Sequence, residues 1–240
     1  MSNEPESGEP RVCVVTGGSS GVGLATAQRF LKAGCCVVIC GRDSARLQAA
    51  EALLAAEGGD NVASINLDVG ESDAGERLIE FSVRRFGRVD VLVNNAGTAP
   101  LAPAHAMSSE EFDRCLSTNI RGVFATTQAA WPGMCRQGGG AIINVSSLSA
   151  VDPFPGLGVY GASKAWVELF TKATAEEGRE HHIHVMAVAP GAVDTPMLHG
   201  LFPDIPHDVR LASDEVAELI YRLSTKAMAN CTGQTISIRR

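Results

Sequence analysis

The sequence lacks the features that mark membrane, nucleic-acid-binding and secreted proteins. No apolar run reaches the ~18 uninterrupted residues that a membrane-spanning helix needs. Positive charge is scarce, since 20 Lys and Arg stand against 27 Asp and Glu, and the net charge of −7 would not attract a phosphate backbone. Residues 1–10 have neither the basic flank nor the apolar core of a secretory signal. We therefore expect a cytoplasmic protein that binds neither membranes nor nucleic acid, with residues 1–10 as a flexible tail.

Metal-binding and disulfide patterns are also missing. The seven cysteines are odd in number and include no CxxC pair, and four lie in or beside apolar runs, as buried free thiols do. His181, His182 and His184 come nearest to a metal-ligand cluster, but a helix C-terminus, whose dipole such side chains offset, accounts for them better. The sequence predicts no metal site and no disulfide framework.

Short apolar segments alternate with longer segments of helical periodicity. The apolar segments predict seven strands at Val12–Val15, Val37–Cys40, Ala63–Leu67, Val89–Val93, Ile142–Val145, His184–Val188 and Thr235–Ile238. The periodic segments predict helices at Val22–Ala33, Ser44–Glu57, Ser72–Phe86, Ser109–Met134, Tyr160–Arg179 and Ser213–Leu223, with Asp43 and Ser109 as N-caps. This alternation is typical of parallel strands joined by right-handed crossovers. The predicted fold class is α/β, a doubly wound, Rossmann-like three-layer sandwich with a seven-stranded parallel sheet.

Residues 11–240 are expected to form a single domain, because no linker interrupts them. In doubly wound sheets, ligands bind beyond the carboxyl ends of the strands, near the point where strand order reverses. The functional residues should therefore lie in the loops that follow strands. Pro203 and Pro206 interrupt the helical pattern over residues 196–211, which we expect to form a substrate lid.

A glycine-rich loop, Thr16–Gly23, follows the first predicted strand and opens the first helix. Glycine permits positive φ and lets backbone amides approach a pyrophosphate, and the helix N-terminus attracts the same anion. A plain glycine-rich turn is the alternative, but this strand–loop–helix context is the one that dinucleotide-binding motifs require. The loop therefore predicts a dinucleotide site.

A tyrosine and a lysine lie at positions i and i+4 of a predicted helix. Tyr160 and Lys164 share a face, so the ammonium is expected to lower the pKa of the phenol and allow proton exchange with a hydroxyl or carbonyl. Many such pairs only solvate a helix surface. However, Ser147 follows the predicted strand Ile142–Val145, at the ligand-binding edge, and can donate a hydrogen bond to a substrate oxygen. Ser146 is its nearest rival.

These motifs resemble those of the short-chain dehydrogenase/reductase family, from Arg11 to about Gln234. The glycine loop has that family's TGxxxGxG spacing, and Asn94–Gly97 matches its NNAG turn. The resemblance implies a catalytic tetrad of Asn119, Ser147, Tyr160 and Lys164. It implies cofactor contacts from Gly17, Ser19, Ser20, Gly21, Val22, Gly23, Arg42, Asp68, Val69, Asn95, Ala96, Gly97, Tyr160, Lys164, Pro190, Gly191, Val193 and Thr195. Asn119 as a helix-kink residue and Pro190-Gly191 as a simple turn are the alternatives.

The end of the second predicted strand bears on the cofactor. NAD enzymes usually carry Asp or Glu there to bind the ribose 2′-hydroxyl, whereas this chain has Gly41-Arg42. The missing carboxylate removes repulsion, and a guanidinium can bind a 2′-phosphate with charge-assisted hydrogen bonds. We expect NADP(H) to be preferred and NAD(H) to remain usable; a merely solvated Arg42 is the alternative.

The resemblance implies an oxidoreductase that transfers hydride between NADP(H) and a carbonyl or secondary alcohol. Carried over by position, Tyr160 is the general acid/base, Ser147 polarises the substrate oxygen, Lys164 binds the nicotinamide ribose and Asn119 anchors a water in the proton relay. Apolar residues of the lid, and before Tyr160, suggest an uncharged, partly apolar small-molecule substrate, such as a 3-oxoacyl compound or ketone. A regulator that binds NADP without turnover is the competing hypothesis, against which the complete tetrad argues.

The family resemblance also implies a homotetramer or homodimer. In relatives, the helix that carries Tyr160 forms the subunit interface. Trp166 and Phe170 lie on this helix and fit either an interface or the core.

Overall fold

The computed structural model describes residues 10–240, so all of the expected tail except Pro10 lies outside the described residues. Seven parallel strands form one sheet in the order β3-β2-β1-β4-β5-β6-β7. The strands are β1 (Val12–Thr16), β2 (Cys36–Gly41), β3 (Val62–Asn66), β4 (Val91–Asn94), β5 (Gly140–Val145), β6 (Ile183–Pro190) and β7 (Thr235–Ile238). The predicted doubly wound fold is confirmed, with small shifts at the strand ends.

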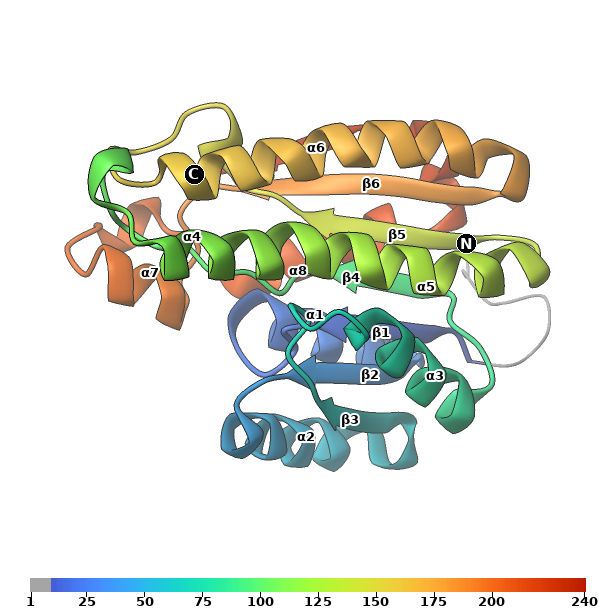
Figure 1. The fold of residues 1–240 in the computed structure, drawn as a ribbon. Coiled ribbons are helices and arrows are strands. Elements are labelled where there is room, and N and C mark those ends of the chain that lie inside the picture. The colour runs from blue at the N-terminus through green and yellow to red at the C-terminus, as the bar shows by residue number, and fades with distance from the viewer. Residues whose placement is uncertain (1–9) are drawn as a thin grey trace.

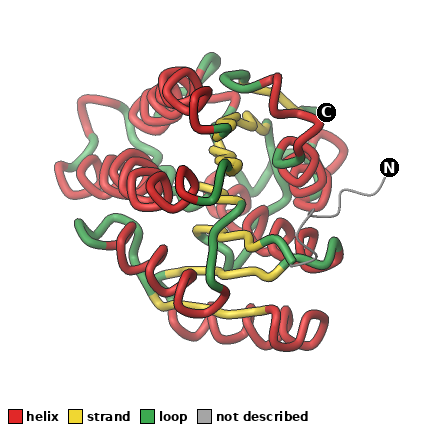
Figure 2. Tube along the Cα trace, turned by 90° about the vertical axis from the view of Figure 1, so that its right-hand side faces the viewer, coloured by secondary structure: helices red, strands yellow, loops and turns green. Residues whose placement is uncertain are grey.

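Helices cover both faces of the sheet (Figures 1 and 2). One face carries α1 (Gly21–Lys32), α2 (Ser44–Gly58) and α8 (Ser213–Leu223). The other carries α3 (Ala74–Phe86), α4 (Ser109–Leu116), α5 (Gly122–Arg136) and α6 (Gly158–Gly178). The short helix α7 (Pro196–Leu201) lies beyond one edge of the sheet, at the left of Figure 1.

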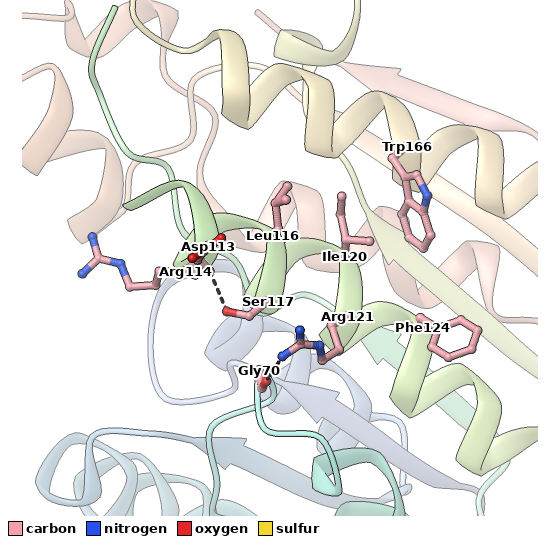
Figure 3. Close-up of a pocket in the computed structure, with 9 residues that line it drawn as sticks. All are labelled: Gly70, Asp113, Arg114, Leu116, Ser117, Ile120, Arg121, Phe124 and Trp166. Carbon is pink, nitrogen blue, oxygen red and sulfur yellow. Dashed lines mark hydrogen bonds between the residues drawn. The ribbon is translucent and has the colours of Figure 1, made fainter. Parts of the chain in front are cut away.

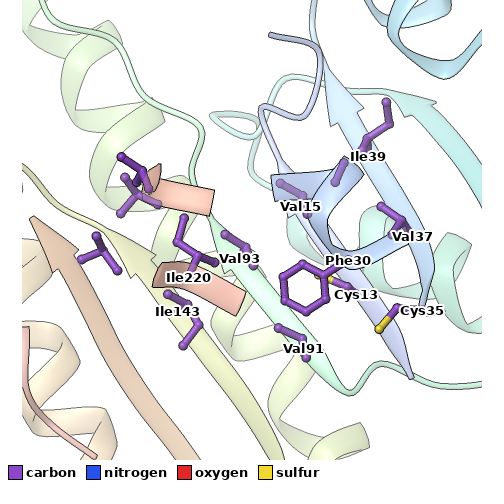
Figure 4. Packing of buried hydrophobic residues seen from close by; sticks show 14 of the residues in the cluster. Cys13, Val15, Phe30, Cys35, Val37, Ile39, Val91, Val93, Ile143 and Ile220 are labelled. Atoms are coloured by element: carbon purple, nitrogen blue, oxygen red, sulfur yellow. The ribbon is translucent and has the colours of Figure 1, made fainter. Parts of the chain in front are cut away.

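The core on the α1 side is an apolar cluster. Phe30 of α1 is fully buried among inward side chains of β1, β2 and β4 (Figure 4). Cys13 and Cys35 belong to this cluster and fill space as small apolar groups. The expectation of buried thiols holds for five of the seven cysteines; Cys135 is half-buried and Cys231 is exposed.

The core on the α5–α6 side contains a continuous chain of buried polar groups. Asn94 and Asn144 are register partners on β4 and β5, and Asn94 Nδ2 donates to Asn144 Oδ1 at 2.9 Å. Thr126 of α5 donates to Asn94 Oδ1 at 2.7 Å. Asn144 Nδ2 donates to Thr171 Oγ1 of α6 at 2.9 Å, and Thr171 donates to the Val167 carbonyl at 2.8 Å. This polar chain, with its amides hydrogen-bonded, ties α5 to α6 across two strands.

Two details of the predicted helix Ser109–Met134 are wrong. A π-helical segment, Ser117–Arg121, separates α4 from α5. The N-cap of α4 is Ser108 rather than Ser109, because Ser108 Oγ accepts a hydrogen bond from Glu111 N (3.2 Å) and donates one to Glu111 Oε2 (2.9 Å). This pairing needs the serine three residues before the glutamate, so the register of the cap was misjudged by one residue.

Residues 196–211 leave and rejoin the domain at one place. Val193 and Leu211 form an isolated parallel β-bridge, and Asp194 N donates to the Leu211 carbonyl at 2.9 Å. The Asp194 carboxylate also binds His199 (2.7 Å) and Arg210 (3.3 Å), one from each end of the segment. Within residues 10–240, none of the helices has the length and apolarity needed to cross a bilayer.

Candidate active site

Loops from several strands gather where the strand order reverses. β1 lies between β2 and β4, so the connections run outward from β1 in both directions. The glycine loop follows β1, and the Asn95–Gly97 turn follows β4. The start of α4 and helix α7 lie at the same edge, at the left of Figure 1. The predicted cofactor loop and the predicted catalytic residues thus share one edge.

The glycine loop is shaped by close backbone approach. Gly17 has φ +66°, and a Cβ built there would lie 2.9 Å from Ala96 Cα. A Cβ at Gly23 would lie 2.2 Å from the Gly17 carbonyl oxygen, so only glycine fits. Ser20, the N-cap of α1, makes no side-chain capping hydrogen bond, which leaves the first amides of the helix available to an anion. These features fit a dinucleotide pyrophosphate.

Thr16 and Asn95 clamp the glycine loop to the turn after β4. Thr16 Oγ1 accepts hydrogen bonds from the amides of Asn95 and Ala96, both at 3.0 Å. Asn95 Nδ2 donates to the carbonyls of Thr16 (2.9 Å) and Gly17 (3.2 Å). The Asn95 side chain, expected to contact cofactor, is therefore used to hold the loop. Thr16 was predicted as the first residue of the cofactor loop, but its role in clamping that loop was not predicted, although a hydroxyl residue directly before the first loop glycine was a usable sign.

Predicted cofactor contacts also follow β2 and β3. Asp68 Oδ1 accepts a hydrogen bond from Gly70 N at 2.9 Å, and Val69 is buried against Gly122 of α5. A Cβ built at Gly41 would lie 3.1 Å from Ser19 Oγ, so the serine hydroxyl borders the position that an acidic side chain would fill. Arg42 is exposed and, among the described residues, forms no ion pair.

Ser147, Tyr160 and Lys164 meet between β5 and the first turns of α6. The Ser147 hydroxyl lies close enough to the Tyr160 phenol to lower the pKa of that phenol. Lys164 is buried, its Nζ lies 5.8 Å from the centroid of the Tyr160 ring, and it donates to the Val145 carbonyl at 2.7 Å. Ser146, the rival of Ser147, is buried and donates instead to Glu168 Oε1 at 2.9 Å. The structure therefore favours Ser147 over Ser146.

Asn119 lies in the π-helical segment between α4 and α5 and is fully buried. Its Oδ1 accepts from Thr98 N and its Nδ2 donates to the Thr98 carbonyl, both at 2.9 Å. A Cβ built at Gly97 would lie 3.5 Å from both Asn119 Oδ1 and Lys164 Nζ, so the NNAG turn, Asn119 and Lys164 border one another. The irregular helix places Asn119 at the active edge, and π-bulges often occur at such sites.

The turn after β6 completes the edge. Pro190 ends β6, and Gly191 N donates to the Ile238 carbonyl of β7 at 2.9 Å. Thr195 N-caps α7 through Leu198 N, and its Cγ2 would lie 3.0 Å from a Cβ built at Gly21. The end of β6 and the glycine loop, far apart in the sequence, therefore lead to segments that lie next to each other.

Comparison with known proteins decides the family. The family model described as short chain dehydrogenase matches residues 11–206. The chain belongs to the short-chain dehydrogenase family. It is 36% identical over 240 residues to a 3-oxoacyl-(acyl-carrier-protein) reductase of Thermotoga maritima, covering 96% of each chain. It is 36% identical over 190 residues to 2-(R)-hydroxypropyl-CoM dehydrogenase of Xanthobacter autotrophicus, covering 78% of this chain and 76% of that one.

A solved structure gives the same picture. The 3-ketoacyl-(acyl-carrier-protein) reductase of Brucella melitensis, complexed with NADH, superimposes with a TM-score of 0.88 at 34% identity, over 96% of this chain and 97% of that chain. As a member of the short-chain dehydrogenase family, the protein is an NAD(P)-dependent oxidoreductase that acts on carbonyl or alcohol groups.

The electrostatics of this dehydrogenase site are governed by burial. Burial raises the pKa of the Tyr160 phenol above its usual value, and the nearby Ser147 hydroxyl offsets only part of this rise. The expected lowering of this pKa by Lys164 is wrong for this structure, because the ammonium is directed at the Val145 carbonyl instead. Burial lowers the pKa of Lys164 to about 8, so this amine is close to titration near neutral pH.

The histidines near the end of α6 are dispersed by the backbone. His182 adopts a left-handed conformation with φ 56°, while His184 lies buried on β6 with Nε2 3.2 Å from the Leu223 carbonyl. His184 was therefore wrongly grouped with a helix end. Across residues 10–240, no group of three or more His, Cys, Asp or Glu is placed to hold a metal ion.

Proposed function

We propose that this short-chain dehydrogenase prefers NADP(H) and uses Tyr160 as its general acid and base. The observation that carries the proposal is the meeting of the Ser147 and Tyr160 side chains at the edge where the glycine loop also lies. A phenol beside a serine hydroxyl and a candidate dinucleotide-binding loop supports proton transfer to a substrate oxygen.

A bound nicotinamide dinucleotide would supply the hydride, and this chain's residues would supply the position and the proton. In the direction of reduction, Tyr160 Oη gives its proton to the carbonyl oxygen of the substrate, which becomes a hydroxyl. Ser147 Oγ donates a hydrogen bond to that same oxygen. The raised pKa of Tyr160 suits this role, because it keeps the phenol protonated at neutral pH.

Lys164 and Asn119 serve the return of the proton. Lys164 would hold the nicotinamide ribose hydroxyl, and Asn119 would anchor a water through which Tyr160 is reprotonated. The buried setting of Lys164 and its nearness to Asn119 at Gly97 support this relay.

Replacing Tyr160 tests the catalytic assignment. Tyr160→Phe should keep NADPH binding, measured by fluorescence, and lower kcat by about 10²- to 10⁴-fold, the usual contribution of acid–base catalysis. The substrate panel is ketones, 3-oxoacyl thioesters, steroids and sugars. A wild-type protein that binds NADPH and oxidises it with none of these carbonyl compounds would favour the regulatory alternative.

The preference for NADP(H) is argued from the edge of β2. Gly41 provides no carboxylate, Ser19 Oγ borders the same space, and Arg42 is free to bind a 2′-phosphate. Arg42→Asp should lower the ratio of kcat/KM for NADPH over NADH by about 10- to 100-fold, as expected for a charge-assisted hydrogen bond. Arg46→Asp is the matched control, since Arg46 lies one turn on and pairs with Asp43. A ratio unaffected by Arg42→Asp would contradict the preference.

The substrate is proposed to be an uncharged, partly apolar carbonyl compound. Val151 and Phe154, which precede Tyr160 in the sequence, and Met197 of the lid are exposed. The rings of Phe154 and Phe202 pack against each other with their centroids 5.6 Å apart. The names of the relatives point to 3-oxoacyl compounds within this class. Turnover confined to highly polar polyols within the panel would contradict the assignment.

A homodimer or homotetramer is proposed to form through the outer face of α4, α5 and α6. A groove of about 770 Å³ lies on this face and is lined by Trp166 and Phe124, among others (Figure 3). The rings of Trp166 and Phe170 stack with their centroids 4.7 Å apart. Leu169, on the same helix, is 68% exposed. Leu169→Glu should shift the mass measured by light scattering toward the monomer. A monomeric wild-type protein would contradict the proposal.

A further inference from the structure

Ser163 lies between Tyr160 and Lys164 on α6, and no role has been assigned to it so far. Its side chain is 1% exposed. The hydroxyl accepts a hydrogen bond from Asn119 Nδ2 at 2.9 Å and donates one to the Tyr160 backbone carbonyl at 2.6 Å. One buried hydroxyl therefore joins two members of the proposed tetrad, Asn119 and Tyr160.

The geometry at Asn119 leaves little freedom in this connection. Thr98 both accepts from Nδ2 and donates to Oδ1, which fixes which way the amide faces. The second amide proton is then directed at Ser163 Oγ. Since the Ser163 proton goes to the Tyr160 carbonyl, Ser163 can only accept from Asn119. The Cys115 thiol closes the cluster, at 3.5 Å from Asn119 Nδ2 and 3.9 Å from Ser163 Oγ.

The connection through Ser163 can stabilise the first turn of α6. Tyr160 is in the first turn of the helix, and the N-cap residue Leu157 makes no side-chain capping hydrogen bond. First turns without a side-chain cap are prone to fray. Ser163 ties this turn to the π-helical segment through Asn119, and thus to the loop after β4 through Thr98.

We propose that Ser163 is a positioning residue that sets the place of the Tyr160 phenol by fixing its backbone to Asn119. The inference rests on the proposed function, in which Tyr160 transfers the proton. A loose first turn would let the phenol drift from the substrate oxygen, and a misplacement of about 1 Å can cost about 10²-fold in rate. Substrate and cofactor binding need not change, because Ser163 is buried and its hydroxyl is used by Asn119 and the Tyr160 carbonyl.

The same helix offers a matched control two turns on. Thr171 also accepts from a buried asparagine amide, Asn144 Nδ2 at 2.9 Å, and donates to a helix carbonyl, that of Val167, at 2.8 Å. Thr171 is fully buried as well. Its hydrogen bonds have the same chemistry but involve no member of the tetrad. Thr171→Val therefore reproduces the loss of stability caused by deleting a buried hydroxyl without changing the position of Tyr160.

The experiment compares Ser163→Ala, Ser163→Cys, Thr171→Val and Tyr160→Phe in the full chain, with NADPH and the best carbonyl substrate of the panel. Both hydroxyl deletions should lower Tm by a few degrees. Ser163→Ala should lower kcat by about 10- to 100-fold, with KM for NADPH within about 2-fold of wild type. Its primary isotope effect with 4-deuterated NADPH should be at least as large as that of wild type. Thr171→Val should keep kcat within about 2-fold.

Ser163→Cys keeps the inference testable if Ser163→Ala does not fold, because a thiol fills the space of the hydroxyl but forms only weak hydrogen bonds. Its kcat should then fall below that of Thr171→Val. The inference is overturned if the Ser163 variants and Thr171→Val show the same kcat at similar Tm. It is also overturned if KM rises while kcat stays constant. If Tyr160→Phe retains full activity, both the proposed function and this inference fail. If Tyr160→Phe is inactive and Ser163→Ala is unimpaired, only this inference is overturned.

Discussion

The cofactor loop and the catalytic groups lie at the same edge of one sheet, but different means hold them in place. Around β1, the shape depends on missing side chains, because a Cβ at Gly23 would lie 2.2 Å from the Gly17 carbonyl. At the candidate catalytic groups, it depends on the buried side chain of Asn119, whose amide is hydrogen-bonded, and the core behind them, between α5 and α6, depends in the same way on Asn144. The first region should therefore be sensitive to added volume, and the second to lost hydrogen bonds.

The largest effect is expected from breaking the polar chain at its centre. Asn144→Ala leaves the amide of Asn94 and the hydroxyl of Thr171 with one partner fewer and creates a small cavity. The free energy of unfolding, measured by urea denaturation, should fall by about 4 kcal/mol. A double-mutant cycle with Thr171→Val should show that the two losses are not additive. Additive losses would mean that the chain does not act as a unit.

The second effect follows from burying Lys164. Its pKa falls to about 8 from an ordinary value of 10.5, so the folded protein binds fewer protons than the unfolded chain between these values. The free energy of unfolding should therefore rise with pH across this interval, by at most about 3 kcal/mol, and the cost of burial is greatest below pH 8. The free energy of unfolding is measured from pH 7 to 10.5 for the wild type and for Lys164→Met, and the difference between the two is plotted against pH. The titration of the buried thiols cancels in this difference. A flat difference would contradict the prediction.

The third effect tests the glycine loop with added volume. Gly23→Ala places a methyl group 2.2 Å from the Gly17 oxygen and 2.5 Å from Asn95 Nδ2, so the loop must shift. The Kd for NADPH should rise by about 10- to 100-fold, the equivalent of the strain that overpacking imposes. Gly133→Ala is the control, because nothing lies within 4 Å of its added Cβ. Wild-type affinity in Gly23→Ala would remove the contrast between the two regions.

The smallest effect concerns His184, a titratable side chain of β6 held against α8 by the Leu223 carbonyl. Burial, the largest cause, lowers the pKa of His184 below its ordinary value of 6.5. The unfolded chain therefore binds the proton more readily, and the free energy of unfolding should fall as the pH drops from 7 to 5. His184→Gln should reduce this slope slightly. An identical slope in both proteins would show that other groups account for it.

The sequence was sufficient for the fold and for naming a candidate site. Seven short apolar segments separated by periodic helices predict a wound parallel sheet, and its inner strands β1, β4 and β6 are buried on both faces. The glycines of the loop and the spacing of Tyr160 and Lys164 are local features, so they can be recognised in the sequence without the tertiary structure.

Other features depended on contacts between distant segments. The rivalry of Ser146 and Ser147 was decided by Glu168, two turns of α6 beyond Tyr160. The clamp of Thr16 on Asn95 joins the ends of two neighbouring strands.

By itself, then, the sequence determined the order of strands and helices, the cofactor loop and the candidate catalytic residues, because these follow from periodicity and short-range spacing. Only the tertiary structure decided the pairing of Asn94 with Asn144 and the bond between Ser163 and Asn119. It also decided the direction of the pKa shift of Tyr160. Strand register sets the first, the packing of α6 against the π-helical segment sets the second, and burial sets the third. All three arise when segments far apart in the chain pack together.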